Sequence, residues 1–175
     1  MIFVTENNNI NLKLLKQNLY ISSWNPKEVT DFHKSIGNKE TPLVELPGIA
    51  KQLGIGNLFL KDESHRLGLN AFKALGASYA MDKQLKKNPK IKTFCTATDG
   101  NPGRAVAWMA RKLGRKALIF MPKGTVPARV EAIEKEGAKV LMIDHGYDIA
   151  VKIADARVND CLLYTSDAAD DVRGV

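Results

Sequence analysis

The sequence predicts an α/β protein, in which helices pack against an open and mostly parallel sheet. Two observations predict this fold class. From about residue 57, short apolar runs alternate with longer segments of helical period, which is the pattern of successive βαβ units. In addition, Gly114 and Gly137 stand where a helical segment ends and the next apolar run begins, as expected for helix C-termini.

Four apolar runs are the candidate strands, and they cover residues 58–60, 92–97, 117–121 and 140–143. The segments between them are long enough for helices of about three to five turns. These expected helices cover residues 71–87, 103–113 and 127–136, and a further one is expected over 147–160. Pro127 stands at the start of its segment, where the missing N–H has no helical partner to lose.

The two ends of the chain differ from this alternating region. Residues 1–50 form a polar N-terminal arm, with a helix expected near Pro26 and an extended stretch over 41–47. Residues 51–160 form a partial α/β domain. Residues 161–175 abandon the helical period, and their charge changes sign. We interpret this tail as non-native read-through of sequencing adapter, with an ordinary frayed tail as the alternative.

Composition excludes several classes of protein. Of the 175 residues, 45% are apolar and 26% are charged, which is ordinary for a globular protein and unlike disordered, collagen-like or coiled-coil chains. No stretch approaches the roughly 18 apolar residues that a membrane span needs, and the first residues lack the pattern of a secretory signal. We therefore expect a cytoplasmic protein with no membrane partner.

The net charge of +7 raises the question of nucleic-acid binding. The densest group of lysines runs from Lys83 to Lys92, toward the end of an expected helix, where cations complement the helix dipole. Because no aromatic residues interleave for base stacking, we favour a solvated face and expect no nucleic-acid partner. The histidines and the two cysteines, Cys95 and Cys161, lack metal-ligand spacing, so no metal is expected. Cys95 lies in an apolar run and is expected to be a small buried hydrophobe.

Lys73 is the first candidate for chemistry. A polar loop that contains glycine, over residues 61–70, leads into the helix expected at 71–87 and places Lys73 in its first turn. The start of a helix carries positive dipole character, which disfavours an ammonium group. A lysine in this position is suited to lose its proton, and a neutral amine is the form that reacts with an aldehyde.

A second polar stretch, residues 96–104, directly follows the next expected strand and opens the next helix. Open α/β sheets bind ligands at the carboxyl ends of their strands, so Asp99 and Asn101 are candidate site residues. Asn101 before Pro102 is also a plain pattern for a helix cap, and that alternative stays open. The nucleotide-binding glycine motifs and the hydrolase G-x-S-x-G motif are absent from the sequence.

Together, Ala71-Phe72-Lys73 and Gly100-Asn101-x-Gly103 resemble the fold type II pyridoxal-phosphate enzymes. Within that group, the segments KDESHRLGLNAFKALGASYA and TATDGNPGRAVAW are similar to those of the diaminopropionate ammonia-lyases. The resemblance extends from about residue 20 to about residue 160. It implies pyridoxal 5'-phosphate as the cofactor, Lys73 as its covalent attachment point and Asn101 as the hydrogen-bond partner of its ring hydroxyl oxygen.

The resemblance also implies a carbon-nitrogen lyase activity, the α,β-elimination of 2,3-diaminopropionate to pyruvate and ammonia. Asp99 corresponds to the acid that takes the α-proton of the D-isomer, whereas the freed Lys73 amine serves the L-isomer. The cofactor ring is the electron sink for the α-carbanion. Our own hypothesis is that the Asp99 carboxylate also faces the β-ammonium group of the substrate, which would favour it over serine. The implied partners are a small amino-acid substrate and, for the full-length enzyme, a second identical subunit.

Two features depart from the family pattern. Pro102 stands where the family usually has histidine, which stiffens the asparagine loop. Family members are about twice as long, and their phosphate-binding loop comes from the half that this sequence lacks. The remaining readings are a serine or threonine dehydratase of the same fold, a catalytically silent fragment and, least favoured, a nucleic-acid binder. Because a truncated sheet exposes a strand edge, we also expect aggregation.

Overall fold

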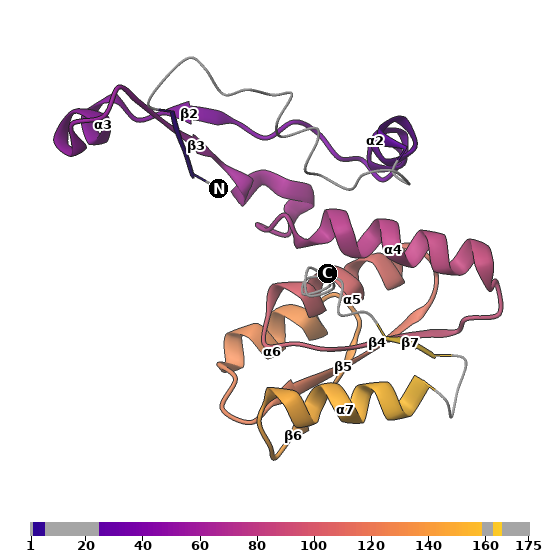
Figure 1. The fold of residues 1–175 in the computed structure, drawn as a ribbon. Helices are drawn as coiled ribbons and strands as arrows, with labels where there is room; N and C mark the ends of the chain where they lie inside the picture. Colours follow the sequence, from indigo (N-terminus) through magenta and orange to yellow (C-terminus); the bar gives the residue numbers. More distant parts are fainter. Residues whose placement is uncertain (1, 6–24, 159–162, 166–175) are drawn as a thin grey trace, which may run out of the picture. The chain divides into compact units, whose positions relative to one another are not determined.

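The computed structural model describes residues 2–5, 25–158 and 163–165. The chain divides into two compact units, Met1–Asn70 and Ala71–Val175. Within the described residues, no helix is both long enough and apolar enough to cross a membrane. Figure 1 shows the elements of both units, coloured along the sequence.

The first unit contains a three-stranded antiparallel sheet. Its central strand is β3 (Asn57–Lys61), which pairs with β1 (Ile2–Thr5) on one side and β2 (Leu43–Glu45) on the other. The prediction that the run at 58–60 belongs to the parallel sheet is therefore wrong. An apolar run predicts a strand but does not specify its partners, and β3 finds both of its neighbours in segments that precede it in the chain.

Short helices and a 3₁₀ segment complete the first unit. The predicted helix near Pro26 is confirmed as α2 (Pro26–Ser35), and the side chain of Asn25 accepts two backbone N–H groups of its first turn at 3.2 and 3.3 Å. Helix α3 (Pro47–Leu53) ends at Gly54, whose φ of 66° is left-handed. The 3₁₀ segment η1 (Glu63–Gly68) follows β3.

The second unit contains a four-stranded sheet in the order β6-β5-β4-β7, and every neighbouring pair is parallel. The strands are β4 (Thr93–Ala97), β5 (Lys116–Pro122), β6 (Lys139–Ile143) and β7 (Leu163–Thr165). The first three strands match predicted runs. The predicted α/β class with a mostly parallel sheet is therefore confirmed.

All four predicted helices are present, and their described ends lie within two residues of the predicted ones, whereas the predicted end at residue 160 lies outside the described residues. They are α4 (Lys73–Lys87), α5 (Asn101–Lys112), α6 (Pro127–Glu134) and α7 (Tyr147–Val158). Gly114 and Gly137 are left-handed after their helices, as predicted. Helix α5 packs on one face of the sheet, with α4 and α6 beside it, whereas α7 covers the other face (Figure 1).

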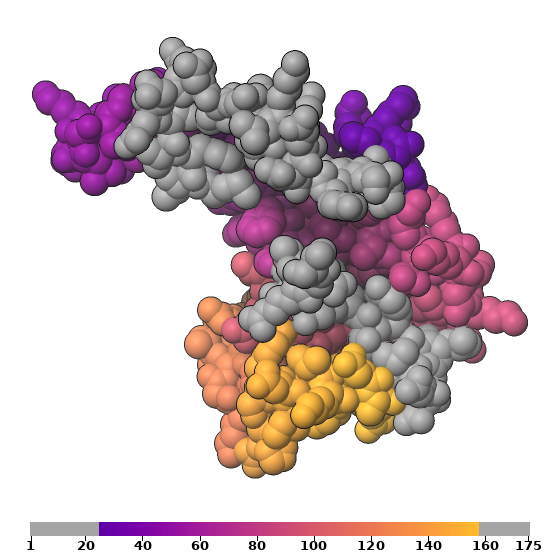
Figure 2. Space-filling view, viewed as in Figure 1, coloured from indigo at the N-terminus to yellow at the C-terminus, as the bar shows by residue number. Residues whose placement is uncertain are grey.

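Successive side chains of β4 and β5 point to opposite faces of the sheet, so buried residues of these strands contribute to a core on each face. Cys95 and Ala97 on β4 and Phe120 on β5 pack against Ala150 and Ala154 of α7. Cys95 is fully buried in this core, which confirms its interpretation as a small buried hydrophobe. The outer side of α7 forms part of the molecular surface in the space-filling view (Figure 2).

A buried carboxylate joins two of the helices on the α5 face. Glu136, just after α6, accepts two hydrogen bonds from the Arg104 guanidinium, both at 3.2 Å, and one from that of Arg111 at 2.6 Å. Both arginines belong to α5 and lie about two turns apart, so this carboxylate holds the end of α6 against α5. A carboxylate that is nearly buried requires such partners.

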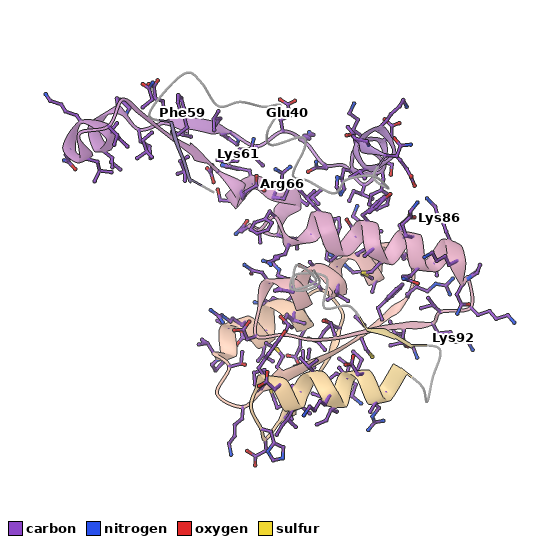
Figure 3. The ribbon with its side chains drawn as sticks, viewed as in Figure 1. Glu40, Phe59, Lys61, Arg66, Lys86 and Lys92 are labelled. Atoms are coloured by element: carbon purple, nitrogen blue, oxygen red, sulfur yellow. The ribbon has the colours of Figure 1, made fainter. Side chains whose placement is uncertain are left out.

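The lysines at the end of α4 and beyond it reach solvent, as expected for a solvated face. Lys86 and Lys92 are both exposed (Figure 3), and Lys86 pairs with Asp82 one turn earlier at 2.7 Å. Of the predicted tail over 161–175, only Leu163–Thr165 lies within the described residues, where it pairs with β4. The non-native origin of the tail stays a prediction. So does the division at residue 50, although the described structure divides most compactly after Asn70.

Candidate active site

Four described helices start at the carboxyl edge of the parallel sheet, and three of them, α4, α5 and α6, lie on the same face. Strand β4 leads through residues 98–100 into α5, and β5 leads through residues 123–126 into α6. Helix α4 packs on α5 and returns to β4 through the short link 88–92, so α4 runs opposite to β4 and begins at the same edge. Open α/β sheets bind their ligands at this edge.

Lys73 is the first residue of α4 and is half-buried. Its ammonium nitrogen lies 5.4 Å from the centre of the exposed Phe72 ring. The first turn of α4 has no acidic residue and no side-chain cap. No carboxylate of that turn therefore offsets the unfavourable position of a cation at a helix start.

Thr98 organises the loop that follows β4. Its side chain is almost completely buried, and its Oγ1 accepts the N–H of Gly100 at 3.1 Å and the N–H of Gly103 at 3.4 Å. Its own N–H donates to the Phe120 carbonyl at 3.0 Å, which ties the loop to β5. One hydroxyl thus fixes the shape of the loop that carries Asp99 and Asn101.

Gly103 sets the distance between α5 and the sheet. A Cβ atom at this position would lie 2.2 Å from Cγ2 of Thr98 and 2.9 Å from Cγ2 of Ile119. Real Cβ atoms essentially never approach other atoms so closely, so only glycine fits here without displacement. The glycine of the predicted motif is therefore required by close helix–strand packing.

Asp99 and Asn101 are both exposed on this loop. The Asp99 side chain is 71% exposed, and its Oδ2 lies 3.8 Å from Nη1 of Arg129 on α6. Helix α5 begins at Asn101 itself; its cap position is Gly100, and no side chain caps it. The alternative that Asn101 caps the helix is therefore wrong. Pro102 lies in the first turn of α5, where a missing N–H costs no helical hydrogen bond.

The three predicted site residues thus belong to one compact unit and to one edge of its sheet. Asp99 and Asn101 share a loop, whereas Lys73 begins the neighbouring helix. Among the residues that the structure describes, no hydrogen bond or ion pair joins Lys73 to either of them.

Two residues that shape the site, Thr98 and Arg129, were not predicted from the sequence. The signal for Thr98 was a hydroxyl residue just before a helix start, but Arg129 had none, because its contact joins separate βαβ crossovers.

The polar loop before Lys73 has a structural explanation that the sequence did not reveal. The guanidinium of Arg66, nearly buried, makes five hydrogen bonds of 2.6–3.1 Å, as many as it has N–H groups. Two go to the Glu63 carboxylate, and the others go to the side chains of Asn38 and Thr41 and to the Lys39 carbonyl. This network joins η1 to residues 38–41.

Neighbouring groups strengthen the network around Arg66. Lys61 donates to the Thr41 carbonyl, and Figure 3 labels Lys61 and Arg66 on β3 and η1. The Arg66 guanidinium holds the pKa of the Glu63 carboxyl below its usual range, and burial opposes this only in part. Just beyond, Leu67 and Asn70 have left-handed φ values of 51° and 58°, which residues with a side chain seldom adopt. The network thus supports a strained turn.

The family of the chain follows from comparison with known proteins. Residues 34–173 match the family described as "Pyridoxal-phosphate dependent enzyme". This match covers most of the chain and includes the Lys73 helix and the Thr98 loop. The chain belongs to the pyridoxal-phosphate-dependent enzyme family.

Individual relatives narrow this assignment. The chain is 44% identical over 149 residues to a diaminopropionate ammonia-lyase of Salmonella typhimurium, and it covers 37% of that protein. It resembles the crystal structure of Escherichia coli diaminopropionate ammonia lyase in apo form with a TM-score of 0.75 and 37% identity, over 79% of this chain and 43% of that one. The same enzyme in complex with D-serine gives a TM-score of 0.74 and 38% identity, over 79% of this chain and 40% of that one.

More distant relatives include an L-threonine dehydratase of Haemophilus influenzae, 36% identical over 110 residues that cover 63% of this chain and 21% of that protein. The match to the ammonia-lyases is both longer and closer. The chain nevertheless spans little more than a third of the length of the curated ammonia-lyases that it matches.

The side chains at the sheet edge fit the ring portion of pyridoxal phosphate. Lys73 offers a primary amine at a helix start without a carboxylate in its first turn, and Asn101 offers an amide that does not cap its own helix. The Thr98 hydroxyl and the close approach at Gly103 fix the backbone between them. Within the described part of the chain we identify no glycine-rich cradle for the phosphate, so the fit concerns the ring and its aldehyde carbon.

Proposed function

We propose that this protein functions in the elimination of ammonia from 2,3-diaminopropionate, which with one water yields pyruvate and two molecules of ammonia. The observation that carries the proposal is the 44% identity to a diaminopropionate ammonia-lyase, in a region that contains Lys73, Asp99 and Asn101. The fixed geometry of the loop that bears Asp99 and Asn101 supports it. The proposal concerns the whole enzyme, since the chain covers 37% of that relative.

Each residue at the edge has a role in this proposal. When bound, the cofactor supplies an electron sink for negative charge at the substrate α-carbon. Lys73 would hold the cofactor through its amine and, once free, accept the α-proton of the L-isomer at Nζ. Asp99 would accept the α-proton of the D-isomer at its carboxylate. Asn101 would orient the ring through its side-chain amide.

The exposed Asp99 carboxylate also supports diaminopropionate over serine as the substrate. Its side chain is 71% exposed at the carboxyl edge, and the Arg129 guanidinium stands 3.8 Å from one oxygen, outside hydrogen-bond distance. The carboxylate therefore has capacity to accept hydrogen bonds from a cationic β-amino group. Serine carries a neutral hydroxyl at that position and would gain less from the negative charge.

The cofactor assignment is tested by titrating the purified chain with pyridoxal phosphate, reducing with borohydride and mapping the modified peptides by mass. We expect the adduct on Lys73 and its loss in Lys73→Ala. The matched control is Lys87→Ala, at the exposed end of the same helix, which should keep the adduct. Modification spread over surface lysines, or equal loss in both variants, contradicts the assignment.

The role of Asp99 is tested by pyruvate release from both isomers of diaminopropionate and from serine. Asp99→Asn should lower the rate with the D-isomer at least about 100-fold, the usual contribution of a general base. Asp144→Asn is the control, because Asp144 is an exposed aspartate that follows β6 at the same edge. Full activity of Asp99→Asn on both isomers contradicts the role. Faster turnover of serine favours the dehydratase, and a Lys73 adduct without turnover favours a silent fragment.

We further propose that the protein works in the cytoplasm as a homodimer, as the resemblance to its family implies. The absence of a membrane-spanning helix among the described residues is compatible with this location. Light scattering of the purified chain with and without pyridoxal phosphate tests the assembly. A mass of two chains supports the dimer, and a monomer at all concentrations contradicts it for this chain.

A further inference from the structure

One peptide unit of the Thr98 loop is held at both of its polar atoms. The carbonyl of Asp99 accepts a hydrogen bond from Nη1 of Arg129 at 3.0 Å. The N–H of Gly100, on the other side of the same peptide plane, donates to Oγ1 of Thr98 at 3.1 Å. Rotation of this plane would break both bonds. The side chain before it is Asp99, and Asn101 comes one residue after it, so the plane determines the direction of both.

Arg129 reaches this peptide from a different part of the fold. It is the third residue of α6, which follows β5, whereas the loop follows β4. Its side chain lies along Gly100, where its Cδ would be 3.7 Å from a Cβ atom added to the glycine. The nitrogen that donates to the Asp99 carbonyl is also the one 3.8 Å from the Asp99 carboxylate. One guanidinium thus contacts the main chain and faces the side chain of the same residue.

We propose that Arg129 is a positioning residue of the active site: it holds the Asp99–Gly100 peptide and so keeps the Asp99 carboxylate and the Asn101 amide in fixed directions. The inference rests on the proposed function, because that function assigns Asp99 to the substrate and Asn101 to the cofactor ring. Active-site groups need supporting residues to keep a productive direction, particularly on loops. Thr98 supplies this support from the buried side of the loop, and Arg129 supplies it from the exposed side.

A contact that served only overall stability would behave differently. The side chains of Arg129 and Asp99 are 57% and 71% exposed, and exposed ion pairs contribute little to folding. Removal of Arg129 should therefore lower the thermal unfolding midpoint by no more than a few degrees, while it loosens the loop. This combination separates a positioning residue from a structural one.

The test compares Arg129→Met, which keeps the length of the side chain but removes its donors, with Arg129→Lys, which keeps a cation and a donor. Arg157→Met is the control, because Arg157 is an exposed arginine on α7. Hydrogen exchange of the Gly100 amide should become about tenfold faster in Arg129→Met, as expected for one lost charge-assisted bond, and the lysine should restore most of the protection. The Asp99 carbonyl chemical shift, measured by NMR, should change most in Arg129→Met, less in Arg129→Lys and not at all in Arg157→Met.

A second measurement connects the loop to the site. The dissociation constant for pyridoxal phosphate should rise about fivefold to tenfold in Arg129→Met, since a misdirected Asn101 amide weakens one hydrogen bond. Unchanged Gly100 exchange and Asp99 carbonyl shift in Arg129→Met overturn the inference, and so does altered exchange with unchanged cofactor affinity. If the unmodified chain forms no Lys73 adduct, the proposed function fails for this chain, and the exchange measurement still decides whether Arg129 holds the peptide.

Discussion

Gly103 and Thr98 show how single atoms determine the shape of the candidate site. The glycine lets α5 approach β4 until the position of a Cβ would lie 2.2 Å from the Thr98 methyl group. This approach also brings the Gly103 N–H within 3.4 Å of the Thr98 hydroxyl. The close packing and the hydrogen bond therefore depend on each other, and together they fix the loop that carries Asp99 and Asn101.

Gly103→Ala should destabilise the chain by about 1–3 kcal/mol, because overpacking of a tight interior contact forces displacement of its neighbours. Gly146→Ala serves as the control, since a Cβ there meets no atom within 4 Å and the residue is not left-handed. Denaturant unfolding of the two variants checks the prediction. Equal stability of Gly103→Ala and the unmodified chain would show that the helix can move away from the sheet without cost.

Thr98→Val should cost about 1–3 kcal/mol, because it leaves the N–H groups of Gly100 and Gly103 without their acceptor at nearly unchanged side-chain volume. Thr98→Ser keeps the acceptor and loses only the methyl group, so it should retain more of the stability. Unfolding free energies of the three chains, with hydrogen exchange of the Gly100 amide, measure the difference. A valine variant as stable as the serine variant would contradict the role of the hydroxyl.

At the scale of elements, η1 depends on charge as well as on packing. Its Arg66 guanidinium is nearly buried and has every N–H group bonded, whereas the exposed pair of Lys27 and Asp31 on α2 is surrounded by water. A buried charge that loses its partner is costly, but an exposed one is rehydrated. Neutralising Glu63, the partner of Arg66, should therefore cost more folding stability than neutralising Asp31, the partner of Lys27.

Glu63→Gln should destabilise the chain by about 2–4 kcal/mol at neutral pH, since it leaves the Arg66 charge buried without its carboxylate. The folded pKa of Glu63 lies below its ordinary value of 4.5, so the stability it contributes is complete above about that pH and is lost as the pH falls through the folded value. The difference between the unmodified chain and Glu63→Gln should therefore shrink in acid.

Urea unfolding from neutral pH down to about pH 2 measures that difference, because this range extends well below the ordinary pKa of 4.5. Asp31→Asn is the control; its exposed pair should give no measurable change at any of these pH values. A gap between the unmodified chain and Glu63→Gln that stays constant down to the acid end would show that the Glu63 charge does not stabilise η1.

The helices and strands of the second unit were predictable because apolar periodicity and end signals are local properties. The pairing of β3 was not, because its partners are set by contacts across the chain. The same limit applies to the site. Lys73, Asp99 and Asn101 were found from their motifs, but the bond from Arg129 to the Asp99 carbonyl joins two separate crossovers. The pair Asn101-Pro102 left a helix cap open as an alternative, whereas α5 begins at Asn101 and its cap position is one residue earlier, at Gly100.

At the scale of the whole molecule, the family match runs through both compact units, from residue 34 to residue 173, whereas Lys73, Asp99 and Asn101 all belong to the second unit. The elements that shape the Asp99 loop, namely β4, β5, α5 and α6, also belong to that unit. The geometry of the loop can therefore form from the second unit's own contacts, and the tests of Thr98 and Arg129 address it directly.

The parallel sheet of that unit has an open edge at β6 in the part of the chain that the structure describes. Met142 lies on this strand with 49% of its surface exposed, and Ile149 on α7 is also exposed. An edge strand offers its free backbone groups to another chain, and charged side chains on natural edges oppose this. On β6 the only charged residue is Lys139 at its start, so the remaining four residues of the strand are uncharged. The chain should therefore self-associate through β6 as its concentration rises.

Met142→Lys should reduce that association more than Ile149→Lys does, although both replace an exposed apolar side chain of similar size with the same charge. The reason is that only Met142 lies on a strand edge, whereas Ile149 changes exposed apolar area alone. Static light scattering over a range of protein concentrations measures the difference. Equal effects of the two variants would show that apolar area drives association, and no association in the unmodified chain would show that the β6 edge is protected.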